Sequence, residues 1–428
     1  MQGLIGPLKE LAEFEELCKN KKKDVGMIRV CGCVNSQKSH MMYAIGDGCK
    51  YKVIACSSET KAKQIYEEYR FLDSNTYLYP AKDFLFYQAD IRSKELVKQR
   101  MEGIQAVLSG EPVTVVTSLD GFMDHLAPKE SIAEKVLKVQ NDSVLKLDEM
   151  AEKLSVIGYD REVQVEGPGQ FAVRGGILDI YPLTEELPVR IELWGDEVDS
   201  IRTFDVESQR SIENLMDIVI YPAVEFPQNG EKGVSFLDYF PPEDTILFLD
   251  EPVRLVERGQ NIEDEFMEAQ KKRLESGYDL EEEEAKIFPV TEILKKINCY
   301  SSIGFYALGM KCKGLEVRES YEIQAKSVNP YNNSFEMLTQ DLKRLKRNGY
   351  RVILLSGSRT RAKRLAEDLR DYNLSSYYSE DLDREVKPGE IMTAYGYIAE
   401  GYEYPMLKFT VIAESDIFGK RKKKKKRK

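Results

Sequence analysis

Residues 32–39 carry a pattern that could bind the phosphates of a nucleotide. The segment runs from Gly32 to Lys38 and Ser39 and fits G-x-x-x-x-G-K-[ST] at every fixed position except the second glycine, which is Gln37. In this motif backbone N–H groups wrap around the phosphates, the lysine contacts the β- and γ-phosphates, and the hydroxyl binds magnesium. Glycine allows the backbone to approach closely, whereas a glutamine side chain should crowd the phosphate. The pattern indicates a vestigial nucleotide site that keeps its fold and has lost its chemistry.

A second half of such a site follows about 210 residues later. Residues 246–251 read ILFLDE, an apolar strand ending in Asp250 and Glu251, the pattern that holds magnesium in ATPases of this class. The alternative to a vestigial site is therefore a P-loop ATPase or helicase-like enzyme that works through Lys38 and Asp250. An arginine finger and the other motifs of a translocase are not evident, so we expect no catalytic residue and no bound cofactor in this chain.

Metal and nucleophile chemistry find few candidates. The chain has two histidines, His40 and His125, and seven cysteines without a C-x-x-C pair. A zinc site lacks plausible ligands, and no Ser/His/Asp or Cys/His set is present. An odd number of thinly spread cysteines also makes a disulfide framework unlikely in a chain of this size. We expect Cys31 and Cys33 to be small apolar residues on a buried strand.

Residues 189–194 form another candidate site, one suited to binding a protein. The sequence VRIELW alternates, so a strand here places its other residues on the core face and Arg190, Glu192 and Trp194 on the opposite face. An exposed tryptophan beside an arginine is typical of a protein-interface hot spot. The alternative is that Trp194 covers a hairpin end and Arg190 forms a solvated ion pair worth less than ~1 kcal/mol.

The register of the following strand decides what else lies on that face. If residues 195–196 (Gly-Asp) form a two-residue turn, Trp194 pairs with Glu197 and Glu192 pairs with Asp199. This register extends the polar face into a mixed surface of carboxylates, an arginine and the only tryptophan of the chain.

Two further arginines are harder to place. Arg174, in the segment AVRGG, either belongs to the same surface or braces its own turn. Arg202 falls on the core side in the simple register, unless a bulge intervenes.

The elements that must position these residues divide the chain into several units, because 428 residues exceed a single ordinary core. Residues 1–128 alternate short apolar runs with charged helical stretches, which predicts the first half of an α/β domain with a mostly parallel sheet. Its strands are expected at 27–33, 52–56 and 113–117, and its helices at 58–71 and 93–108.

The pattern of apolar and turn-forming residues changes twice more along the chain. Glycine-rich turns between short alternating strands predict a small β-rich α+β insert over 129–222, and the second half of the α/β domain follows at 223–326. A second compact α/β domain is expected over 327–419. Its elements, with those of the resumed α/β domain, are expected at 245–249, 251–274, 335–348, 351–355, 358–371, 390–394 and 409–413.

Charge is distributed unevenly. Residues 420–428 are all lysine or arginine, so the other 419 residues carry a net charge of minus 20. An acidic body is poorly suited to generic DNA binding, which depends on neutralised phosphates. The polybasic tail is expected to be an exposed linker, and the alternative is a weak, salt-sensitive nucleic-acid arm. The sequence has no apolar run of membrane-spanning length and no secretory signal at its start, so we expect a cytoplasmic protein without membrane contact.

Several segments together resemble the N-terminal part of the bacterial transcription-repair coupling factors. They are YPAKDFLFYQADIRS at 79–93, the long run from FAVRGG to ESQRS at 171–211, FLDEPVRL at 248–255 and IAESDIFG at 412–419. The resemblance implies a UvrB-like α/β domain with degenerate nucleotide motifs, interrupted by a UvrA-binding-type domain and followed by another α/β domain. Residues Gly32, Gln37, Lys38, Ser39, Asp250 and Glu251 would be the vestigial site.

The resemblance also implies a function. Arg174, Arg190 and Trp194 match the positions that contact UvrA, so the chain is expected to be a non-catalytic scaffold that recruits this excision-repair protein. Family members continue into an RNA-polymerase-binding domain and an ATP-driven DNA translocase, which are expected to supply the contacts with polymerase, DNA, ATP and magnesium. This chain stops at Lys428.

Overall fold

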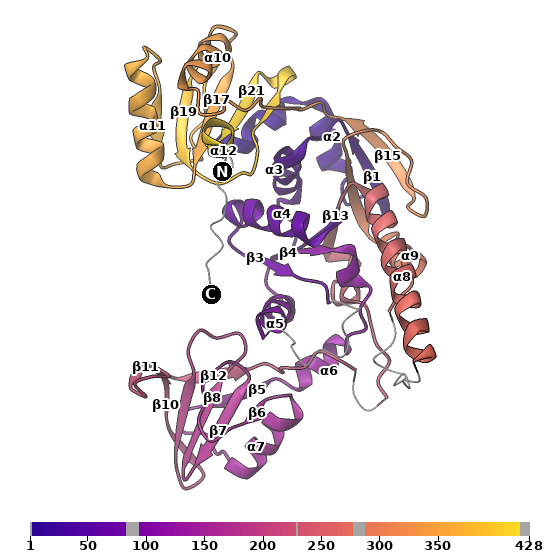
Figure 1. The fold of residues 1–428 in the computed structure, drawn as a ribbon, viewed down its shortest axis with the longest axis vertical. Helices are drawn as coiled ribbons and strands as arrows, with labels where there is room; N and C mark the ends of the chain where they lie inside the picture. The colour runs from indigo at the N-terminus through magenta and orange to yellow at the C-terminus, as the bar shows by residue number, and fades with distance from the viewer. Residues whose placement is uncertain (1, 83–93, 228–229, 277–286, 420–428) are drawn as a thin grey trace.

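The computed structural model describes residues 2–82, 94–227, 230–276 and 287–419 (Figure 1). The polybasic run 420–428 lies outside the described residues, and so does 83–93, most of the first segment that carries the family resemblance. The mixed α/β class expected from the sequence is confirmed: the described residues form a seven-stranded parallel sheet, two six-stranded mixed sheets and a two-stranded antiparallel sheet.

The central sheet has seven strands, and every pairing in it is parallel. Its order is β15 (Val317–Glu322), β1 (Gly26–Cys31), β14 (Ser301–Tyr306), β13 (Thr245–Asp250), β2 (Tyr51–Cys56), β4 (Val113–Ser118) and β3 (Thr76–Tyr79). Strands from the two ends of residues 26–322 therefore share one sheet. The strand expected at 27–33 ends two residues earlier, at Cys31, and one strand, β14, lies between the two halves of the predicted nucleotide site.

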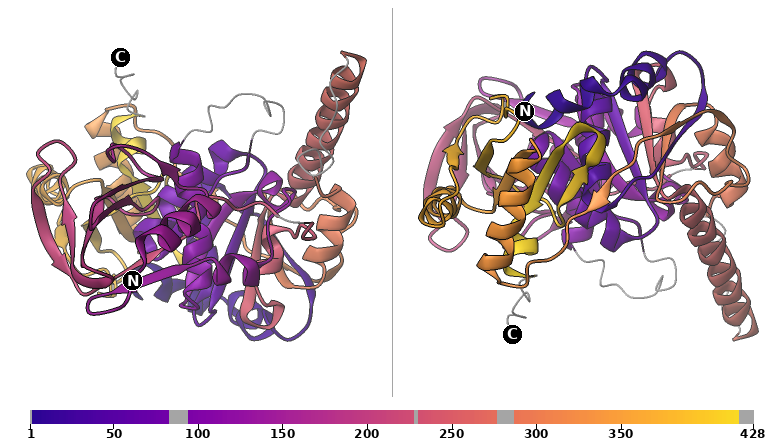
Figure 2. Two further views of the ribbon diagram at one scale, coloured as in Figure 1. Left: turned by 90° about the horizontal axis from the view of Figure 1, so that it is seen from below. Right: turned by 90° about the horizontal axis from the view of Figure 1, so that it is seen from above.

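Helices cover both faces of this sheet, because its strands carry apolar side chains on both faces. One face packs against α2 (Ala12–Asn20), α3 (Asn35–Gly46) and α4 (Glu59–Leu72), and the other against α5 (Lys94–Leu108), α8 (Pro252–Glu275) and α9 (Val290–Ile297). The hydroxyl of Ser58 caps α4 by accepting a bond from the backbone of Lys61. The far end of α8 projects from the body of the molecule (Figure 2).

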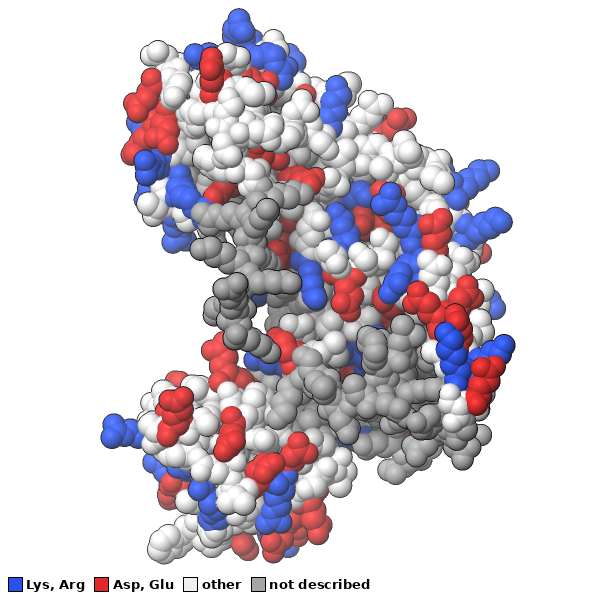
Figure 3. Space-filling model, in the orientation of Figure 1, with Lys and Arg blue, Asp and Glu red and all other residues white. Residues whose placement is uncertain are grey.

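Residues 137–220, here called the inserted domain, form a separate unit at the bottom of Figure 1. Its six-stranded sheet has the order β11 (Ser211–Leu215), β10 (Glu197–Phe204), β9 (Val189–Trp194), β8 (Ile177–Tyr181), β7 (Gln170–Arg174) and β6 (Asp160–Arg161). A second, two-stranded sheet pairs β12 (Asp217–Ile220) with β5 (Leu137–Gln140). Helix α7 (Leu147–Val156) covers one face of the large sheet. Acidic and basic side chains are mixed on the surface of this unit (Figure 3).

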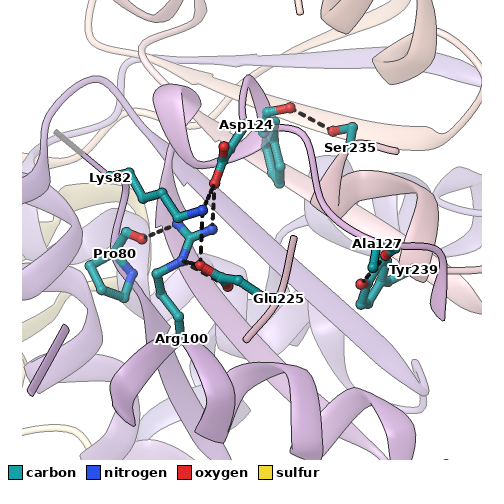
Figure 4. Close-up of polar contacts among 9 residues, drawn as sticks. Pro80, Lys82, Arg100, Asp124, Ala127, Glu225, Ser235 and Tyr239 are labelled. Atoms are coloured by element: carbon teal, nitrogen blue, oxygen red, sulfur yellow. Dashed lines mark hydrogen bonds and ion pairs between the residues drawn. The ribbon is translucent and has the colours of Figure 1, made fainter. Parts of the chain in front are cut away.

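A buried ion cluster fastens the inserted domain to the central domain where the chain passes between them (Figure 4). Arg100, on α5, is fully buried and donates from Nε to both carboxylate oxygens of Glu225 at 2.7 and 3.0 Å, and from Nη2 to Asp124 at 2.7 Å. Lys82 reaches the same two carboxylates at 2.8 and 3.1 Å. Glu225 follows the inserted domain, and its carbonyl accepts a bond from Ala127, just before that domain. The cluster therefore ties α5 to both segments that connect the central domain with the inserted domain.

The last unit packs its six-stranded sheet between helices and the central domain. The order is β16 (Lys326–Ser327), β20 (Tyr402–Tyr404), β21 (Phe409–Ala413), β17 (Arg351–Ser356), β19 (Ile391–Tyr395) and β18 (Tyr377–Ser379). Helices α10 (Phe335–Arg347), α11 (Arg359–Asp371) and α12 (Glu414–Phe418) pack on one face. The other face shares one continuous apolar core with α3 and the central sheet, so the two units pack directly against each other.

Candidate functional sites

The helix of the predicted nucleotide motif begins early, before the position of the second glycine. Helix α3 starts at Asn35, so Lys38 already lies in its first turn and its backbone N–H is directed to the carbonyl of Val34. The motif works through a loop of free backbone N–H groups before the helix. Only residues 32–34 remain for such a loop.

The backbone of this short loop is bonded elsewhere. The N–H of Cys33 donates to Tyr306 at 3.1 Å, and the carbonyl of Gly32 accepts from Ala325 at 3.0 Å. Gln37, the residue in place of the second glycine, is buried and its Oε1 accepts from the N–H of Val34 at 3.2 Å. The glutamine thus caps the early helix, which stabilises the closed loop.

Lys38 is held by the two carboxylates that the motif would reserve for magnesium. Its Nζ lies 2.8 Å from Asp250 and 2.6 Å from Glu251, and its side chain is only 6% exposed. Burial opposes the charged lysine, but the two carboxylates outweigh it and raise the pKa of Lys38. A hollow of about 470 Å³ lies beside these residues and is also lined by Lys61 and Arg254. The structure therefore brings the predicted halves together as an ion triad.

The hydroxyls of the motif take part in the contact with the last unit. Ser36 and Ser39 donate to the buried carboxylate of Glu68 at 2.6 and 2.5 Å. The same carboxylate accepts from the backbone of Ala399, and the backbone of Glu400 donates to the Ser36 hydroxyl. A hydroxyl that would bind magnesium is thus occupied in joining two domains.

His40, on the same helix, gives this joint a pH dependence. Its ring lies between the Tyr404 hydroxyl at 3.0 Å and the carbonyl of Leu4 at 2.9 Å, and complete burial lowers its pKa from 6.5 to about 4. In the unfolded chain the His40 ring takes up a proton below pH ~6.5, whereas in the folded chain it does so only below pH ~4. The contribution of the neutral ring to folding stability is therefore complete above pH ~6.5 and is lost as the pH falls from ~6.5 to ~4. We expect urea denaturation to show a loss approaching ~3 kcal/mol between these limits.

The control for this prediction uses the only other histidine. A His125→Gln variant should keep the dependence, because it retains His40. Equal unfolding free energies at pH 7 and pH 5 in the wild-type chain would contradict the assignment.

The outer face of the inserted sheet, opposite α7, holds the candidate protein-binding residues. Asp179 is 1% exposed and lies between two arginines: both of its oxygens accept from Arg190, at 2.7 and 2.9 Å, and one accepts from Arg174 at 2.5 Å. Arg190 also donates to Gln209 and stacks 4.5 Å above the Phe204 ring. The Asp179 carboxylate therefore fixes both guanidinium groups on one face.

The two arginines differ in what they offer a partner. The side chain of Arg190 is 15% exposed, and its hydrogen bond to Asp179 raises its pKa, so it mainly braces the sheet. The solvated ion pair considered from the sequence is wrong, because the carboxylate of this pair is buried. Arg174 is 45% exposed and can contact both Asp179 and a partner.

Trp194 ends β9 with its side chain 83% exposed. It pairs with Glu197 as expected, but the partner of Glu192 is Ser200 instead of Asp199, because the register shifts between residues 198 and 200. The predicted pairing with Asp199 is therefore wrong.

The same bulge moves Arg202 to the outer face, where it forms an ion pair with Glu192. The structure thus gathers Arg174, Arg190, Arg202 and Trp194 on one face. Asp179, which orients two of them, was missed; its position between Leu178 and Ile180 in an alternating strand is the signal that places it on the polar face.

Other chemistry has no support in the part of the chain that the structure describes. There, no three histidine, cysteine or acidic side chains are grouped so as to hold a metal ion. None of the described helices combines the length and the apolar character needed to cross a membrane.

The chain is similar to known proteins over part or most of its length. A sequence model of the family described as "UvrB interaction domain" matches residues 137–226. The chain is 25% identical to a transcription-repair-coupling factor of Bacillus subtilis over 98% of its own length and 41% of that protein, and 25% identical to those of Staphylococcus haemolyticus and Staphylococcus aureus over 83–84% of its length and 35% of theirs. The chain thus spans about two fifths of its curated relatives or less.

One solved structure also aligns with much of the chain. It is a hypothetical ATP-dependent RNA helicase from Sulfolobus tokodaii, aligned over 92% of this chain and 82% of its own with 10% identity. Its TM-score of 0.26 is too low to support an argument.

Proposed function

We propose that this chain, which is related over nearly its whole length to the N-terminal part of the transcription-repair-coupling factors, is a scaffold that recruits the excision-repair protein UvrA. The surface that binds UvrA is the outer face of the inserted sheet. The observation that carries the proposal is that the exposed side chain of Trp194 and the half-exposed guanidinium of Arg174 lie on the same face of the sheet. Rigid aromatic and arginine side chains dominate the energetics of protein interfaces.

The scaffold in this proposal is not a catalyst. Three features support this part: the early start of α3, the capture of Lys38 by Asp250 and Glu251, and the use of the Ser39 hydroxyl by Glu68. Each removes a group that nucleotide binding would need. The hollow beside Lys38 is the observation that favours the alternative, an ATPase, but Lys38 itself already faces the carboxylates of Asp250 and Glu251.

The wider role follows from the relatives. We propose that the chain acts in the cytoplasm, in transcription-coupled nucleotide excision repair, as the part of a coupling factor that engages UvrA. In this proposal, other parts of such a factor contact RNA polymerase and DNA. Those parts also use ATP and magnesium.

Replacing Arg174 by alanine tests the proposal. It should weaken binding of the chain to purified UvrA about 10-fold, because it removes an exposed guanidinium from the border of the surface and leaves Arg190 to neutralise Asp179. Titration calorimetry measures the affinity, with circular dichroism to verify the fold. The matched control is Arg161→Ala, an exposed arginine on the edge strand β6 that pairs with the start of β7, away from Arg174 at the end of β7, and it should bind normally. Equal affinities of the two variants would remove Arg174 from the site.

A further inference from the structure

Three large apolar side chains are exposed at one end of the inserted sheet. Trp194 is 83% exposed, Val144 is 78% exposed and Met216 is 76% exposed. They come from three separate segments: the end of β9, the loop before α7, and the link between β11 and β12.

Backbone pairing brings these segments together. Glu197 pairs with Trp194 on one side and forms an antiparallel bridge with Val144 on the other. Residues opposite each other across a ladder direct their side chains to the same face, so Val144 and Trp194 lie on one face, on the two sides of Glu197. The carbonyl of Met216 accepts a bond from Asn141 at 3.0 Å, which places Met216 beside the same loop.

The loop that carries Val144 is fixed in place. Hydrogen bonds between backbone groups hold it. The N–H of Asp142 donates to the carbonyl of Val198 at 2.9 Å, the N–H of Val198 donates to the carbonyl of Ser143 at 2.9 Å, and the N–H of Leu145 donates to the carbonyl of Asp196 at 2.7 Å. These bonds extend the sheet by one short strand. The neighbouring Leu145 is buried in the core, and side chains alternate between the two faces along an extended segment. Val144 is therefore exposed because of its position in this alternation.

Carboxylates border the three apolar residues. Asp142, Asp196, Glu197, Asp199 and Asp217 are all exposed, and each apolar residue has one of them within two positions in the sequence. Lys146, the exposed cation that follows this loop, is already paired with Glu149 at 2.8 Å. The half-exposed guanidinium of Arg174 lies on the other side of Trp194, at the end of β7, two strands from β9.

We infer that Val144, Trp194 and Met216 form one apolar docking patch with an acidic border, which fits a protein surface whose apolar centre is flanked by lysine or arginine. This inference rests on the proposed function and extends its site to two residues outside the strands with the UvrA-type motif. Clustered exposed apolar side chains with a polar border mark protein interfaces. Opposite charge across the border fixes the orientation of the partner and speeds its association.

Serine substitutions in the patch test the inference, with purified UvrA as the probe. The double variant Val144→Ser/Met216→Ser should lose at least 10-fold in affinity, because both substitutions remove apolar contact area from the centre of the interface. A double variant Asp196→Asn/Glu197→Gln should associate more slowly and with a weaker dependence on salt. The matched control is Val163→Ser, which removes an 87% exposed valine from another part of the same domain and should bind like the wild type.

The outcomes separate this inference from the function on which it rests. If the serine double variant binds within 2-fold of wild type while Trp194→Ala loses affinity, the extended patch is wrong and the proposed function stands. If all of these variants bind UvrA like the wild type, the outer face is not the contact surface, and only an absence of binding by the wild type itself would overturn the recruitment. All substitutions are at exposed positions, and thermal melting identifies any variant whose fold is altered.

Discussion

Replacing Arg100 by methionine should lower the free energy of unfolding by about 3–5 kcal/mol. The guanidinium is fully buried and is the main partner of two buried carboxylates, Glu225 and Asp124. Burial opposes the charge of Glu225, but Arg100 and Lys82 together hold its pKa below the usual range. Without the guanidinium, Lys82 alone must neutralise both acids, and the carbonyl of Pro80 also loses its donor.

Urea denaturation followed by circular dichroism measures this effect. The control Arg364→Met makes the same substitution at an exposed position of α11 and should change stability by less than ~0.5 kcal/mol. Because the cluster joins the crossings to and from the inserted domain, the Arg100 variant should also expose residues near 127 and 225 to limited proteolysis. A loss of stability no larger than that of the control would show that the cluster does not hold the domains together.

Replacing Arg190 by glutamate should unfold the inserted sheet locally. The new carboxylate would face Asp179, which is 1% exposed and would keep only Arg174 as a cation. Breaking a buried ion pair in this way costs about 3–5 kcal/mol, and here a like charge is added. The stacking of Arg190 on Phe204 is lost as well.

Hydrogen exchange of β8 and β9 measures this local effect. Their amides should lose protection in Arg190→Glu and keep it in Arg174→Ala, whose side chain is far more exposed. A loss of UvrA binding in Arg190→Glu would therefore report unfolding and could not identify a contact residue. Full protection in the variant would mean that Arg190 is a free surface side chain.

The sequence predicted part of the strands and helices of the α/β units, and it missed β3, β14 and β15 of the central sheet. Residues 409–413 form a strand with the expected bounds, and the helix expected at 358–371 differs by one residue at its start. Both have a clear period and a local end signal, such as the Ser358 cap.

The candidate sites were predicted less completely, because their geometry depends on distant contacts. The bulge after Val198 redirects Arg202, and nothing in the local pattern of β10 requires it. The early start of α3 depends on Gln37 and on contacts with Tyr306 and Ala325, far along the chain. The burial of Asp179 beneath two arginines likewise requires the register of three strands.

The titration of UvrA with the wild-type chain and with its Trp194→Ala variant tests the proposed recruitment most directly. Trp194 is 83% exposed, so its removal should leave the unfolding free energy within ~0.5 kcal/mol of wild type. We expect saturable binding by the wild type and a loss of affinity of about 30-fold or more in the variant, equivalent to at least ~2 kcal/mol at a hot spot. Equal affinities for a folded Trp194→Ala variant and the wild type, or no binding by either, would contradict the account.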